Sequence, residues 1–155
     1  MRVFNFSLGR LLEYRRHTEQ ERAQTLVDAR QESDSANQAK DDLLKIQQAG
    51  RAKLAEAHRQ GGSIGHLLNM EYVLEKMEEH VQAADEVCQE ADEKLVESVR
   101  HYSEAVQDRN SLDKLKDRRM DEWKVEEGRR EQKELDEIAI TRHGRRVLVA
   151  PGERE

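Results

Sequence analysis

The side chains that could bind a metal ion or transfer a proton are plentiful in this sequence, but their spacing suits neither task. No two histidines are three or four residues apart, and the helical zinc motif His-Glu-x-x-His is absent. Carboxylates are abundant, yet the slender helical hairpin predicted below has no cavity that would desolvate them for acid–base catalysis. We therefore expect no catalytic residue, no metal site and no cofactor, and a protein that is not an enzyme. The six histidines lie at positions 17, 58, 66, 80, 101 and 143.

A glycine-rich stretch, RQGGSIGH at residues 59–66, is a candidate for binding phosphate through the backbone. It holds three of the chain's eight glycines. A phosphate-binding loop would also need Gly-Lys-Ser/Thr after a strand, and neither is present. Instead, Gly61 or Gly62 can adopt the left-handed conformation that ends a helix, and Ser63 can accept a hydrogen bond from the amides of the next helix. The stretch predicts a turn between two antiparallel helices.

The composition excludes several classes of protein. Charged residues make up 39% of the 155 residues and hydrophobic residues only 35%, too few for a conventional globular core. A net charge of −6 does not suit a dedicated nucleic-acid binder. The single cysteine, Cys88, cannot form an internal disulfide. We expect its thiol to be a small buried side chain between the two helices rather than a reactive group. With no apolar run near the roughly 18 residues of a membrane span and no signal peptide, we expect a cytoplasmic protein that meets membranes only through partners.

Two heptad patterns flank the glycines and predict an all-α, antiparallel two-helix coiled coil. The pattern after the glycines is the stronger one, while the pattern before them is weaker and rich in small residues, which lets the helices approach closely. The first comprises Leu67, Met70, Leu74, Met77, Val81, Ala84, Cys88, Ala91, Leu95, Ser98, Tyr102, Ala105, Arg109 and Leu112. The second comprises Leu8, Leu11, Leu26, Ala29, Ser33, Ala36, Leu43, Ile46, Gly50, Leu54 and Ala57.

These patterns define one coiled-coil hairpin over residues 1–143, with helices at about 8–59 and 64–141 and a turn at 60–64. Their lengths are unequal, about 78 and 117 Å at 1.5 Å per residue. Leu8 should therefore lie opposite residue 117, which leaves the end of the second helix, around 120–141, overhanging. Trp123 lies on this part and could either anchor a partner or pack against Phe4 or Phe6. Residues 144–155 are expected to form a flexible tail.

Motifs at both ends of the chain resemble those of the bacterial flagellar export protein family FliJ. The start reads Phe4-x-Phe6-x-Leu8-x-x-Leu11-Leu12-x-x-Arg15. The block after the turn is Leu67 followed by Tyr72-Val73-Leu74-x-x-Met77-x-x-x-Val81, although the family often has an aromatic residue in place of Val73. The most specific piece is EQKELDEIA at residues 131–139, which is similar to the family's C-terminal signature. The tail from Val147 has no counterpart.

The resemblance implies a non-catalytic coiled-coil stalk of the flagellar type III export apparatus, on the cytoplasmic side of the inner membrane. Its partners would be the hexameric export ATPase, the cytoplasmic domain of the membrane export gate, and export chaperones. The family's surfaces map ring binding onto Gln132, Lys133, Leu135, Asp136, Glu137 and Ile138. They map gate binding onto Leu43, Ile46, Val73 and Met77. Two alternatives stay open: the stalk of an injectisome ATPase, and a structural coiled coil that self-associates through the overhang.

Overall fold

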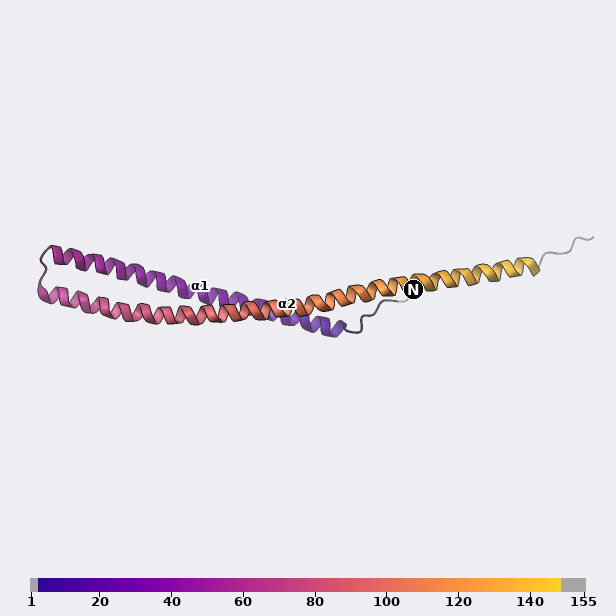
Figure 1. The fold of residues 1–155 in the computed structure, drawn as a ribbon, viewed down its shortest axis with the longest axis horizontal. Coiled ribbons are helices and arrows are strands. Elements are labelled where there is room, and N and C mark those ends of the chain that lie inside the picture. Colours follow the sequence, from indigo (N-terminus) through magenta and orange to yellow (C-terminus); the bar gives the residue numbers. More distant parts are fainter. Residues whose placement is uncertain (1–2, 149–155) are drawn as a thin grey trace, which may run out of the picture. The chain divides into compact units, whose positions relative to one another are not determined.

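The computed structural model describes residues 3–148, with side-chain environments for residues 3–143. Helix α1 spans Gly9–Arg59, and helix α2 spans Ile64–Leu148. No strand occurs among residues 3–148 (Figure 1). The expected start and end of α1 and start of α2 agree with these bounds to within one residue. The expected end at 141 was seven residues too early, so residues 144–148 of the expected tail are helical, and residues 149–155 lie outside the described residues.

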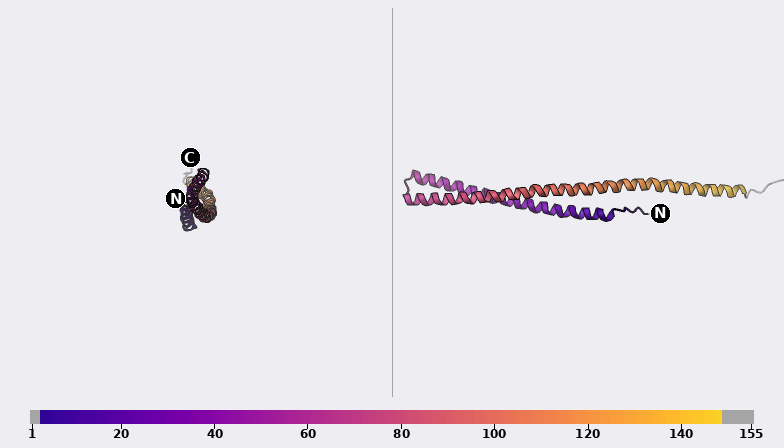
Figure 2. Two further views of the ribbon diagram at one scale, coloured as in Figure 1. Left: turned by 90° about the vertical axis from the view of Figure 1, so that its left-hand side faces the viewer. Right: turned by 60° about the horizontal axis from the view of Figure 1, so that its bottom comes forward.

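The chain divides into two compact units, which are described separately. One unit comprises residues 15–107 and therefore holds most of α1, the turn and the first half of α2. The other comprises residues 3–14 together with 108–148. In the first unit, α1 and α2 lie side by side and run antiparallel, as Figures 1 and 2 show from several directions. The predicted fold class, an all-α coiled-coil hairpin, is confirmed.

The turn between the helices is built by its glycines, as predicted. Gly61 has a φ of 72°, in the left-handed region that costs a residue with a side chain about 1–2 kcal/mol. Its amide donates to the carbonyl of His58 at 3.3 Å, and the amide of Gly62 donates to the carbonyl of Ala57 at 3.0 Å. This pair of hydrogen bonds is a Schellman motif. The hydroxyl of Ser63 then accepts a hydrogen bond from the amide of His66 at 3.3 Å and caps α2.

Replacing Gly61 with alanine should destabilise the hairpin by about 1 kcal/mol, because the new Cβ strains a left-handed backbone. Gly65 provides a matched control, since it lies in the first turn of α2 and a Cβ there meets no atom within 4 Å. Gly65→Ala should leave stability unchanged or raise it by a few tenths of a kcal/mol. Urea titration followed by circular dichroism measures both. Equal stabilities for the two variants would contradict the role given to Gly61.

The predicted seam of α2 is confirmed. Cys88, Ala91, Ser98 and Ala105 are buried, and every other residue of that heptad pattern is half-buried. Small side chains dominate the most buried layers, and they let the helices approach closely. At Gly50 of α1, an added Cβ would come within 2.8 Å of the Cδ2 atom of Leu74. The glycine therefore accommodates the leucine of the facing helix.

The predicted seam of α1 was wrong at three positions. Leu8 and Leu11 are exposed, and Leu12 is buried in their place. Ile46 is 54% exposed, whereas Gln47 is 5% exposed. Taking Ile46 as a seam residue broke the regular alternation of four- and three-residue steps, which requires position 47. Gln47 is tolerated in the seam because its amide donates to Glu78 at 2.8 Å.

The second unit joins the start of the chain to the later part of α2. Residues 3–8 are not helical, and the amide of Gly9 donates to the carbonyl of Phe6 at 3.0 Å where α1 begins. The rings of Phe4 and Trp123 pack at a centroid distance of 6.0 Å with an interplanar angle of 58°. Of the two predictions for Trp123, the structure thus favours packing against Phe4.

Candidate protein-interaction surfaces

Polar contacts between α1 and α2 in the unit of residues 15–107 define the register of the hairpin. Lys40 forms an ion pair with Asp85, and further along the hairpin Lys94 pairs with Glu32 at 2.9 Å. The hydroxyl of Ser33 donates to Asp92 at 2.6 Å. Nearer the turn, Arg51 pairs with Glu78 at 2.9 Å. Each contact of this kind is weak at a surface, but together they disfavour a shifted register, which would separate all of them.

Lys40 and Lys94, the two lysines of these contacts between the helices, are held in the charged form. The hydrogen bond and then the charge of Asp85 raise the pKa of Lys40 above its ordinary value, and Glu32 raises the pKa of Lys94 in the same way. Because a lysine already carries its proton at neutral pH, these pairs persist throughout the physiological range. They are structural contacts rather than a proton-transfer site.

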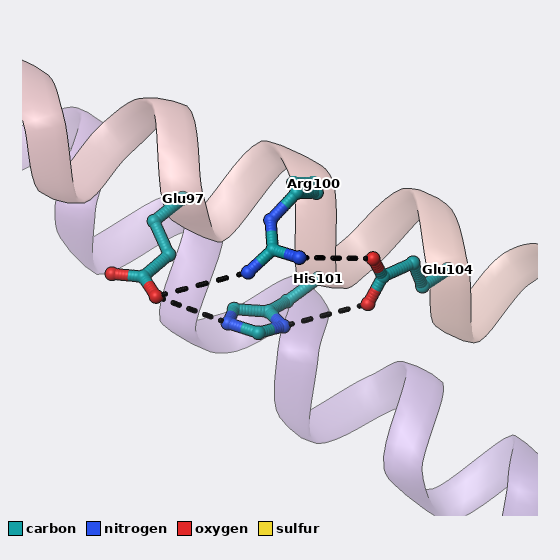
Figure 3. A network of polar contacts seen from close by, with 4 residues as sticks. All are labelled: Glu97, Arg100, His101 and Glu104. Carbon is teal, nitrogen blue, oxygen red and sulfur yellow. Dashed lines mark hydrogen bonds and ion pairs between the residues drawn. The ribbon is translucent and has the colours of Figure 1, made fainter.

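A second polar network lies along α2 alone (Figure 3). His101 lies between two glutamates, with Nε2 3.4 Å from Glu97 and Nδ1 3.7 Å from Glu104. Arg100 reaches Glu104 at 3.2 Å and Glu97 at 3.9 Å. Each of these contacts joins residues three or four positions apart on one helix, a spacing that stabilises helices by a few tenths of a kcal/mol per pair. Among the described residues, no group of three or more His, Cys, Asp or Glu side chains could hold a metal ion.

The six residues expected to bind the ATPase ring lie in a part of α2 that the rest of its unit leaves uncovered. Every side chain from Gly128 to His143 is exposed. Leu135 is 61% exposed and Ile138 50%. The amide of Gln132 donates to Asp136 at 3.0 Å, which orients both side chains along the helix. We call this set the terminal surface: Gln132, Lys133, Leu135, Asp136, Glu137 and Ile138.

Three of the four residues expected to bind the export gate line one apolar groove near the turn, within the unit of residues 15–107. These are Ile46, Val73 and Met77, whereas Leu43 is half-buried and does not line the groove. We call this feature the tip groove, and its volume is about 280 Å³. Sequence reasoning did not assign the other lining residues to this surface. Gly50, Met70 and Leu74 were predicted as seam residues, whereas Ala49, Lys53 and Asn69 are small or polar and gave no signal.

Within residues 3–148, neither helix contains a segment apolar enough to cross a bilayer.

These observations define a class of protein, namely a two-helix coiled-coil hairpin whose exposed apolar surfaces suit contact with other proteins. A family model described as "Flagellar FliJ protein" matches residues 4–148. The chain belongs to this family, and it is therefore a component of the flagellar protein export system. No curated protein and no solved structure matches it.

Proposed function

We propose that the protein is a non-catalytic stalk of the flagellar export apparatus that binds the hexameric export ATPase through the terminal surface and promotes ring assembly and hydrolysis. The observation that carries this proposal is the run of exposed side chains from Gly128 to His143, within a chain that matches the FliJ family over residues 4–148. A helix of this length with exposed Leu135 and Ile138 has apolar area to bury against a partner.

The tip groove supplies a second contact, with the cytoplasmic domain of the membrane export gate. Ile46 and Val73 are each about half exposed and border an apolar groove. Exposed apolar side chains gathered at one place are typical of protein-binding surfaces. Export chaperones are the third class of partner in this proposal. In this proposal the protein works on the cytoplasmic side of the inner membrane, where its partners hold it.

Self-association through the uncovered part of α2 is the second candidate function. Exposed Leu135, Ile138 and Ile140 favour it, because a second copy would bury the same side chains. Sedimentation at several concentrations distinguishes the two, since a stable dimer supports self-association and a persistent monomer removes it. The matching family is flagellar, which favours the flagellar system over an injectisome.

The proposed function is tested by mixing the full-length protein with the cognate export ATPase. We expect faster ATP hydrolysis and more hexameric rings, measured by phosphate release and by electron microscopy. The protein alone should release no phosphate. Unchanged hydrolysis and unchanged ring formation would together refute the role as a stalk.

A further inference from the structure

The tip groove has an apolar floor formed where Leu74 of α2 packs against α1 at Gly50, which has no side chain. The neighbouring Ala49 has only a small side chain, and the space beside Leu74 is open as the groove. Met70 and Met77 extend the apolar lining along α2, and methionine adapts readily to the shape of an incoming group. The groove can therefore receive one bulky apolar side chain from outside.

The walls of the groove present apolar atoms to solvent. Ile46 on α1 is 54% exposed, and Val73 on α2 is 51% exposed. An apolar side chain that entered between them would remove area from both walls as well as from the floor. This burial would drive binding without selecting one apolar side chain over another.

Charge supplies the selectivity that the apolar lining lacks. Lys53 lines the groove and is exposed, and it forms no ion pair within the described part of the chain. Two other basic residues in this part of the hairpin do form ion pairs: Arg51 pairs with Glu78 at 2.9 Å, and Lys76 pairs with Glu79 at 2.8 Å. None of the residues that line the groove is acidic. The rim thus carries an uncompensated positive charge beside an apolar slot.

We propose that the tip groove binds a segment of a partner protein in which an apolar or aromatic side chain stands next to a carboxylate, with the carboxylate paired to Lys53. The inference deepens the contact with the export gate and rests on the proposed function for the identity of that partner. The groove itself selects by chemistry: the apolar group enters over Leu74, and the acidic group remains at the rim. An exposed pair of this kind adds modest affinity and mainly sets specificity and orientation.

Two dyes that differ by one sulfonate group, and therefore in charge, test the chemistry directly. One is 8-anilino-1-naphthalenesulfonate, an aromatic anion, and the other is N-phenyl-1-naphthylamine, which has the same rings without the sulfonate. Val73→Asp should weaken both dyes, because it places a charge on the wall of the groove. Lys53→Gln should weaken the anionic dye by about three- to fivefold and leave the neutral dye unchanged. Fluorescence titration of the full-length protein measures all four combinations.

Lys45→Gln is the matched control, because Lys45 is an exposed lysine of α1 that does not line the groove and lies 3.9 Å from Asp42. It should leave both dyes unchanged. The inference is overturned if Lys53→Gln leaves the anionic dye unchanged, if Lys45→Gln weakens it equally, or if Val73→Asp affects neither dye. Circular dichroism of each variant confirms that the hairpin is folded.

The same variants separate this inference from the proposed function. Binding of the gate's cytoplasmic domain should fall about three- to tenfold in Lys53→Glu and remain unchanged in Lys45→Glu. If the gate domain fails to bind even the unaltered protein, the proposed gate contact is wrong, while the dye titrations still decide whether the groove selects an apolar anion. If the gate domain binds and Lys53→Glu has no effect, the gate contact stands and the pairing with Lys53 is refuted.

Discussion

Ala91→Asp should unfold the hairpin of residues 15–107, with a loss of about 3 kcal/mol or more. Ala91 is only 2% exposed and lies in a seam of small side chains, so an aspartate there must either bury an unpaired charge or force the helices apart. The neighbouring Asp92 accepts a hydrogen bond from the buried hydroxyl of Ser33, and separation of the helices would break this bond as well. Thermal and urea unfolding followed by circular dichroism measures the loss.

Ala83→Asp is the control for this prediction, since it makes the same change on the same helix at an exposed position. Surface substitutions of this kind usually change stability by less than about 0.5 kcal/mol. The comparison removes the effect of helix propensity, which is the same for both variants. Similar melting of the two proteins would mean that the register of the seam is wrong.

Ile138→Asp should lower the affinity for the export ATPase by about 30-fold, and with it the stimulation of hydrolysis at limiting concentration. An anchor at the centre of an interface is typically worth about 2 kcal/mol or more, and aspartate both removes the apolar group and brings a charge into the contact. Ile138 lies three residues after Leu135, on the same side of α2, so the two side chains form one apolar patch within the terminal surface. Hydrolysis measured against protein concentration reports the change.

Ile140→Asp is the matched control. Ile140 belongs to the same exposed stretch and is itself 72% exposed, but it points about 200° away from Ile138 around the helix. We expect stimulation close to that of the unaltered protein. Both variants should retain full helicity, because neither side chain packs against another element of its unit. Equal loss in the two variants would refute the assignment to one face, and no loss in Ile138→Asp would refute the terminal surface as the ring contact.

The sequence predicted the helices and the turn well because those signals are local. The end of α1, the left-handed glycine and the cap at Ser63 each depend on residues within a few positions of one another. The end of α2 was placed too early, since Gly144 interrupts the pattern without ending the helix at that point. A single glycine weakens a helix by about 1 kcal/mol, which a long helix can tolerate.

The residues of the tip groove were predicted only in part. Which side chains line the groove depends on what the facing helix covers. Ile46 was placed in the seam and also among the gate-binding residues, and the structure contradicts the first placement. Because Ile46 is exposed and lines the tip groove, its role in gate binding stays a proposal. Gly50 was predicted as a seam residue, but only the structure shows Leu74 packed opposite it at the groove. Lys53 was not predicted, since a lysine on a charge-rich helix looks ordinary until it is found beside the groove without an ion pair.

By itself, the sequence determined that this chain forms two long helices joined by a turn at Gly61 or Gly62, because helix propensity, heptad spacing and turn chemistry act over short distances. Only the tertiary structure decided which side chains each helix buries. Leu12 is buried rather than Leu11, because α2 covers only one stripe of α1 and either of two adjacent leucines could supply it. Gln47 is buried rather than the more hydrophobic Ile46, because the position on that stripe, and not the residue type, decides burial. The packing of Phe4 on Trp123 is likewise known only from the tertiary structure, since it joins residues more than a hundred positions apart in the sequence.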